Sequence, residues 1–309
     1  MRCDLCERES VIDQPYRQAH LCGPHFDRSI VERVRAEFHR QLPGFSGGTV
    51  AVALSGGKDS TVALALSRAY FGRRPTVRLV ALTVDEGIAG YRDASIRAAE
   101  RACAALDIEH RVLRAEDELG WSTDRAARQL TSTIPCSFCG VWRRSLLNRG
   151  ARELGADALV LGFNLDDLAQ TVLMNVIQGD LDRLVRMAPH RRRRPGLIPR
   201  LAPLAEIPER EVFLYARRQG LPFDHRECPY AARAARNLYR SIVWTLEESR
   251  PGTRQSLLKI QRRLADRLGD LAPGPSAVCD NCGEPAAGPL CRSCAYLRIA
   301  EAPPREVPA

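Results

Sequence analysis

Residues 49–66 read TVAVAL-SGGKDS-TVALAL, which is an apolar run, a glycine-rich hexapeptide and a second apolar run. The first run has the pattern of a buried parallel strand, and the second continues as a helix. A glycine-rich turn between a strand and a helix N-terminus presents backbone amides and the positive end of the helix dipole to a phosphate. A Walker A loop needs four residues between its glycines, which this turn lacks. Residues 55–60 are therefore predicted to form a phosphate-binding loop of a kind other than Walker A.

Strands and helices alternate on the C-terminal side of this turn. Strands are predicted at 78–85, 110–113 and 158–162, and helices at 91–106, 139–154 and 166–178. This alternation predicts an α/β fold with a doubly wound parallel sheet. Ligands of such sheets bind beyond the carboxyl ends of the strands, so the loops at Ser55, Asp85 and Gly162 should converge on one nucleotide site. Two further helical stretches are expected at 206–219 and 233–269.

Ten of the eleven cysteines fall into patterns. The spacing at both ends of the chain is that of structural zinc sites, because a C-x-x-C knuckle brings two thiolates close enough for one ion. His20 is an alternative to His25 that breaks the spacing, and Gly283 is placed to relax a knuckle turn. The predicted ligands are Cys3, Cys6, Cys22 and His25 for the first zinc, and Cys279, Cys282, Cys291 and Cys294 for the second.

The middle set of cysteines lacks a fourth member. Cys136 and Cys139 form a C-x-x-C pair, and their unassigned companion is Cys228. Three thiolates with one open position suit a 4Fe–4S cluster. A redox pair and a zinc site completed by His225 remain alternatives. Cys103 lies on an apolar helical face and is assigned to the core.

The composition favours a polyanionic partner. The 309 residues carry a formal charge of +9, with 44 arginines and two lysines. This surplus predicts nucleic acid binding, and the arginine run at 191–194 is either a solvated loop or a contact to RNA phosphates. No apolar run approaches the roughly 18 residues of a membrane helix, and residues 1–6 lack the apolar region of a signal peptide. We therefore expect a cytoplasmic protein without membrane contact, in which disulfides do not form.

Three motifs together match a known group: SGGKDS, the Cys136/Cys139 pair with distant Cys228, and GFNLDDLAQT at 162–171. The chain resembles the TtuA-type tRNA 2-thiouridine synthetases and their wobble-uridine relatives, which are PP-loop ATP pyrophosphatases. The resemblance implies an adenine nucleotide alpha hydrolase-like fold flanked by zinc modules. It also implies a tRNA sulfurtransferase that adenylates the 2-carbonyl oxygen of uridine with ATP and Mg²⁺ and then inserts sulfur.

The resemblance assigns roles by position. Cys136, Cys139 and Cys228 would ligate the 4Fe–4S cluster and act in catalysis together with Asp167. Asp85 is either a nucleotide contact or a turn former, and Arg143 is either a phosphate contact or part of a solvated helix face. Phe163 and Leu168 stand where members commonly carry His and Glu. The predicted ATP contacts are Ala53, Leu54, Ser55, Gly56, Gly57, Lys58, Asp59, Ser60, Asp85, Arg143, Gly162 and Asp167.

Four regions are expected along the chain. They are a zinc finger at 1–27, the PP-loop domain at 28–205, a basic helical region at 206–272, and a zinc ribbon with its tail at 273–309, after a linker at 272–275. The family implies a thiocarboxylated ubiquitin-like sulfur carrier as partner, and a homodimer is a further expectation. The target, uridine 54 or uridine 34, stays open. The alternatives are another PP-loop adenylating enzyme, an amidotransferase or lysidine-type tRNA synthetase with structural zinc alone, and an RNA-binding zinc-ribbon adaptor without enzymatic activity.

Overall fold

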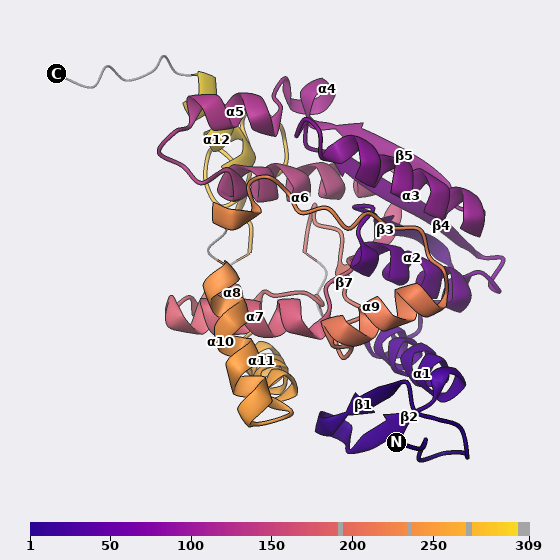
Figure 1. Cartoon of the computed structure of the whole chain (residues 1–309). Helices are drawn as coiled ribbons and strands as arrows, with labels where there is room; N and C mark the ends of the chain where they lie inside the picture. The colour runs from indigo at the N-terminus through magenta and orange to yellow at the C-terminus, as the bar shows by residue number, and fades with distance from the viewer. Residues whose placement is uncertain (191–193, 234–235, 270–273, 302–309) are drawn as a thin grey trace.

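A five-stranded parallel sheet organises the chain (Figure 1). The computed structural model describes residues 1–190, 194–233, 236–269 and 274–301. The strand order is β5-β4-β3-β6-β7, and every neighbouring pair is parallel. The strands are β3 (Gly48–Ala53), β4 (Val77–Asp85), β5 (Glu109–Arg114), β6 (Ala156–Val160) and β7 (Arg200–Leu201). The chain order reverses between β3 and β6, which places a switch point, and hence a ligand crevice, at their carboxyl ends.

Helices cover both faces of the sheet because successive strand residues point to opposite sides. Val50 and Val52 lie in one core cluster with α1 (Gly23–Gln41), α2 (Lys58–Phe71) and α3 (Arg92–Leu106). Ala51 lies in a second cluster with α6 (Pro135–Glu153). This arrangement confirms the predicted doubly wound α/β class.

The remaining elements extend the sheet domain on several sides (Figure 1). Helices α10 (Arg236–Ser249) and α11 (Thr253–Leu268) pack against α7 (Leu165–Ile177), α9 (Glu209–Arg218) packs against α2, and α12 (Arg292–Glu301) packs against α6. Near the N-terminus lie β1 (Ile12–Gln14), η1 (Pro15–Arg17) and β2 (Ala19–Leu21), and β8 (Ala277–Val278) pairs with β9 (Pro285–Ala286). The other helices are α4 (Ala115–Leu119), α5 (Thr123–Gln129), α8 (Leu181–Val185) and η2 (Ala231–Arg233).

Two predicted helices need correction. The helix expected from residue 139 begins at Pro135, so Cys136 as well as Cys139 lies inside its first turns. Proline favours the first position of a helix, where a missing N–H costs nothing. The stretch expected at 233–269 is divided into α10 and α11, and Gly252 between them has φ +96°. A left-handed glycine after Pro251 ends the regular hydrogen bonding there.

Some predictions fall outside the described part of the chain. These are residues 191–193 of the arginine run, residues 272–273 of the linker, and the tail at 302–309. Among the described helices, none has the length and apolar character needed to cross a membrane.

Candidate functional site

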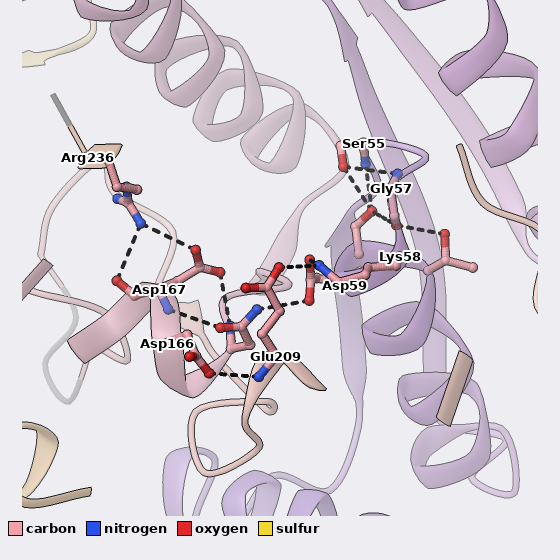
Figure 2. A network of polar contacts seen from close by, with 11 residues as sticks. Ser55, Gly57, Lys58, Asp59, Asp166, Asp167, Glu209 and Arg236 are labelled. Atoms are coloured by element: carbon pink, nitrogen blue, oxygen red, sulfur yellow. Dashed lines mark hydrogen bonds and ion pairs between the residues drawn. The ribbon is translucent and has the colours of Figure 1, made fainter. Parts of the chain in front are cut away.

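The phosphate loop lies where β3 meets α2 (Figure 2). Gly57 is the N-cap of α2, which begins at Lys58. The Ser60 hydroxyl receives a hydrogen bond from the Ser55 amide at 3.1 Å and donates to the Gly57 carbonyl at 3.0 Å. Gly56 has φ +85°, and a Cβ there would meet the Ser95 carbonyl oxygen at 1.9 Å. The turn therefore needs glycine, and its amides form a cradle suited to a phosphate.

The loop after β6 closes against this turn. A Cβ on Gly162 would lie 2.7 Å from the Ser60 amide nitrogen, so the two backbones touch. The Asn164 side chain donates to Asp59 Oδ1 at 2.9 Å. Asn164 also caps α7 and forms a reciprocal capping box with Asp167. These contacts bring the two strand ends together, as the sequence predicted.

Lys58 is held between two carboxylates. Its Nζ lies 2.9 Å from Asp59 Oδ2 and 2.7 Å from Glu209 Oε1 (Figure 2). Burial lowers the pKa of Lys58, but both acids raise it, and the net shift is upward. Lys58 therefore stays charged and can neutralise a phosphate. Glu209 begins α9 and donates its backbone amide to Asp166 Oδ2 at 2.7 Å.

Asp167 lies at the start of α7, facing the same network. Its Oδ1 accepts a hydrogen bond from Arg236 at 3.3 Å, and Oδ2 accepts one from the Asn164 amide at 3.3 Å. Burial raises the pKa of Asp167 to about 6, Asp59 adds to the rise, and Arg236 opposes it. Asp167 is thus an acid whose charge is sensitive to what enters the site.

Other predicted residues lie around the edge of the site. Asp85 ends β4 and accepts a hydrogen bond from the Gly87 amide at 3.0 Å, which is a turn-forming contact. Leu54 is buried in the core, so its backbone is the part that can face a nucleoside, and Ala53 is half-buried at the end of β3. Phe163 is 40% exposed, whereas Leu168 packs in a core cluster with Leu258 and adds no polar group.

The three middle cysteines border one site. Cys136 and Cys139 lie one turn apart on α6. Cys136 Sγ lies 3.8 Å from the Tyr230 carbonyl oxygen, which brings the Cys228 segment against α6. The other end of that segment reaches the phosphate loop, because the Asp224 amide donates to the Gly56 carbonyl at 2.8 Å. The segment 224–230 therefore connects the nucleotide cradle with the cysteines.

The spacing of Cys136, Cys139 and Cys228 suits a metal cluster better than a single metal ion. In both four-ligand sets the ligand atoms lie within 4.8 Å of one another, but the three middle thiols do not form such a set. A four-iron cluster holds its thiolates further apart than a single zinc ion does. His225 packs against Phe223, with ring centroids 4.3 Å apart, and joins no metal-ligand set among the described residues. Burial raises the pKa of all three thiols in the metal-free chain, so a bound metal would have to displace their protons.

Arg143 lies beside the cysteines. Its guanidinium is 3.6 Å from Cys139 Sγ and 2.5 Å from Glu86 Oε1, and Glu86 raises its pKa. A cation here can balance the negative charge of an iron–sulfur thiolate site.

The N-terminal tetrad is preformed. Cys3 Sγ lies 3.3 Å from His25 Nδ1, and Cys6 Sγ lies 3.6 Å from Cys22 Sγ. His20 lies 3.4 Å from Asp13 instead, so His25 is the ligand that the fold offers.

The C-terminal tetrad has the same character. Cys282 Sγ lies 3.7 Å from Cys291 Sγ, and the Cys294 amide donates to Cys291 Sγ at 3.4 Å. Gly283 has φ +70°, as the knuckle requires. Burial opposes ionisation of Cys279, but hydrogen bonds from neighbouring backbone amides lower its pKa to about 6, which favours the thiolate that zinc binds.

Several site residues were missed from the sequence: Glu86, Asn164, Glu209 and Arg236. Asn164 could have been found, because Asn-x-x-Asp before an apolar run is a capping signal. The other three contact the site through segments distant in sequence, and no local spacing indicates them.

The comparisons with known proteins cover nearly the whole chain. Residues 28–246 match the family described as PP-loop domain, and residues 2–27 match 2-thiouridine synthetase TtuA, N-terminal LIM domain. The chain is 40% identical over 320 residues to the tRNA 2-thiolation protein NcsA of Haloferax volcanii, covering 98% of this chain and 100% of that protein. It is 38% identical over 311 residues to cytoplasmic tRNA 2-thiolation protein 1 of Bos taurus, covering 96% and 87%.

A solved structure agrees with these relatives. The U34-tRNA thiolase NcsA from Methanococcus maripaludis, solved with its 4Fe–4S cluster, superposes with a TM-score of 0.85 at 34% identity, over 96% of each chain. The similarity therefore covers all but a small part of each chain. The chain belongs to the PP-loop family of tRNA 2-thiolation proteins.

Proposed function

We propose that this chain catalyses the ATP-dependent 2-thiolation of a tRNA uridine, at the wobble position 34. The observation that carries the proposal is the segment 224–230, which runs from the Gly56 carbonyl to Cys136 and so joins the nucleotide cradle to the three cysteines. The solved relative is a U34-tRNA thiolase, which favours position 34 over position 54.

The chemistry needs two displacements. The uridine 2-oxygen attacks the α-phosphorus of ATP, the bond to the β-phosphate breaks, pyrophosphate leaves and the N3 proton is lost. A hydrosulfide sulfur then attacks C2, and the C2–O bond breaks as AMP departs with the oxygen. The amides of the phosphate loop, Lys58 and a Mg²⁺ ion would stabilise the departing pyrophosphate. Asp59 and Asp167 offer carboxylates for that ion or for the N3 proton.

The cluster site is assigned to Cys136, Cys139 and Cys228. A 4Fe–4S cluster held by these three thiolates would have one iron without a protein ligand. That iron could bind the sulfide that is transferred to the base. Arg143 would balance the charge of the cluster. The two tetrads are proposed to bind one structural zinc ion each. The sulfur carrier protein and the homodimer stay predictions, and we propose that the chain acts in the cytoplasm, as the names of its relatives indicate.

The decisive experiment follows the product and its position. The chain, reconstituted anaerobically with iron and sulfide, should convert unmodified tRNA to 2-thiouridine-34 and release AMP with the product. Cys228→Ala should lose the iron and the thiolation. Cys103→Ala, which changes a buried core thiol outside the site, should retain both.

Three outcomes would contradict the proposal. A fully active, iron-free Cys228→Ala variant would remove the cluster from the mechanism. Product at position 54 would correct the target. Zinc without iron, together with adenylation of another acceptor, would favour an amidotransferase or lysidine-type enzyme.

A further inference from the structure

Residues 86–92 comprise the loop between β4 and α3 and the first residue of α3. This segment contacts three parts of the site, and we call it the junction loop. Arg92 reaches the phosphate loop, Glu86 reaches α6, and Gly90 and Tyr91 meet the segment that carries Cys228. The proposed function assigns no role to this loop.

The centre of the junction loop is a buried ion pair. Arg92 Nε lies 2.7 Å from Glu86 Oε2, and each side chain is 5% exposed. The two other nitrogens of Arg92 donate to the carbonyls of Ser55 at 3.2 Å and Val84 at 2.6 Å. Burying two charges costs free energy, and their mutual attraction offsets only part of that cost. A pair of apolar side chains in place of Arg92 and Glu86 would therefore stabilise the fold equally well. A role in positioning accounts for the pair better than stability does.

The second oxygen of Glu86 continues the contacts toward the cysteines. Glu86 Oε1 accepts from Arg143 Nε at 2.5 Å, and the Arg143 guanidinium lies 3.6 Å from Cys139 Sγ. The order Ser55–Arg92–Glu86–Arg143–Cys139 is therefore an unbroken line of polar contacts from the nucleotide cradle to a cluster ligand. The contacts at Ser55, between Glu86 and Arg143, and at Cys139 are hydrogen bonds, whereas Arg92 and Glu86 are joined by an ion pair without hydrogen-bond geometry.

The backbone holds this line in place. The Glu86 carbonyl accepts from the Thr123 amide at 2.8 Å, and Gly87, at φ +66°, accepts from the Asp124 amide at 3.3 Å. On the opposite side, Arg226 donates to the Gly90 carbonyl at 2.9 Å and to the Tyr91 carbonyl at 3.1 Å. Movement of the phosphate loop would therefore shift both α6, which carries Cys136 and Cys139, and the segment 224–230, which carries Cys228.

We infer that Glu86 and Arg92 are positioning residues that couple nucleotide binding in the phosphate loop to cluster binding at Cys136, Cys139 and Cys228. The inference rests on the proposed cluster. A phosphate bound to the loop would pull on Arg92, and a charged cluster at the cysteines would pull on Arg143. Both arginines are paired with Glu86, so the two binding events depend on the same ion pairs. By linkage, loading the cluster changes nucleotide affinity by the same factor as nucleotide changes cluster affinity.

Binding without turnover tests this coupling. The Kd of a non-hydrolysable ATP analogue with Mg²⁺ is measured by calorimetry on cluster-free and cluster-loaded chain, without tRNA. We expect the two Kd values to differ by about 5- to 10-fold in the wild type. In Glu86→Gln, which keeps the shape but removes the charge, the ratio should fall below about 2. Asp93→Asn, which removes an exposed charge next to Arg92, should keep the wild-type ratio.

A second variant guards against misfolding. Arg92→Lys preserves the charge but cannot reach Glu86, Ser55 and Val84 at once, so it should also lose the coupling. The ratio of the two Kd values is taken within each variant, so a change in nucleotide affinity that is common to the cluster-free and cluster-loaded forms cancels, and saturable binding of the analogue shows that the variant is folded. A wild-type ratio near one, or a wild-type ratio retained in both Glu86→Gln and Arg92→Lys, overturns the inference even if thiolation is confirmed. A chain that takes up no iron refutes the proposed function itself, and the inference with it.

Discussion

At the residue scale, Asp167 holds its proton more tightly in the folded chain than in the unfolded one. Burial and Asp59 raise its pKa from 3.8 to about 6. A raised carboxyl pKa favours folding at low pH, and that contribution is lost as the pH rises through about 6. Asp167→Asn should therefore raise Tm by about 1–3 °C at pH 8 but have little effect near pH 4. Thermal melts of both proteins between pH 4 and 8 measure this, and a variant less stable than the wild type at pH 8 would contradict it.

Gly162 gives a second residue-scale prediction. A methyl group there would lie 2.7 Å from the Ser60 nitrogen and 2.8 Å from its Cα, so the phosphate loop must shift. Gly162→Ala should weaken binding of the ATP analogue by about tenfold or more, because a displaced loop misaligns its amides. Gly288→Ala is the control, since nothing lies within 4 Å of its Cβ position. Equal affinities in the two variants would mean that the loop tolerates the displacement.

At the element scale, helix α6 carries two of the cysteines proposed to bind the cluster and packs against α12. Phe138, between those cysteines, is fully buried, and its ring lies 6.2 Å from that of Tyr296. Trp142 Nε1 donates to the Ser293 carbonyl at 3.4 Å. The C-terminal module thus supports α6, the helix proposed to carry two cluster ligands, through α12, because ligands keep their geometry only when the surrounding packing fixes them.

Shortening one side chain of α12 tests that support. Tyr296→Ala should remove about 1–2 kcal/mol of packing and should shorten the lifetime of the cluster in air roughly threefold, because α6 loosens. Visible absorbance followed over time measures the loss. Ile299→Ala, on the same helix but 58% exposed, should match the wild type. If both variants lose the cluster at the wild-type rate, α12 is not a support.

The elements also show what a sequence can predict. The strand–turn–helix at 48–71 and the doubly wound parallel class of the sheet were predictable, because buried parallel strands are apolar runs and alternating strands and helices limit the topology. The start of α6 was misjudged because C-x-x-C suggests a turn, although Pro135 indicated a helix. The Lys58–Glu209 and Arg92–Glu86 pairs were out of reach, because they depend on where distant loops meet in three dimensions.

At the scale of the whole molecule, a group of arginines lies close to the cysteine site on α6. Arg144 follows Arg143 on α6, and Arg200 lies on β7. Within the described ranges neither guanidinium has a carboxylate partner. Burial and Arg144 lower the pKa of Arg200 to about 10, and burial followed by Arg143, Arg292 and Arg183 lowers that of Arg144. An anion reduces the repulsion between neighbouring cations, and the phosphates of a tRNA backbone are such anions.

The salt dependence of tRNA binding tests this surface. Each phosphate contact releases counterions, so Arg144→Gln and Arg200→Gln should each lower the slope of log Kd against log salt by about 1. Both variants should weaken binding of any tRNA several-fold without changing the Kd of the ATP analogue, because phosphate contacts do not read sequence. Arg73→Gln is the matched control, since this exposed arginine follows the C-terminal end of α2, whereas the phosphate loop lies at the N-terminal end of that helix. Unchanged slopes in both variants would mean that tRNA reaches the site over another face, and the unpaired arginines would then need a different anion.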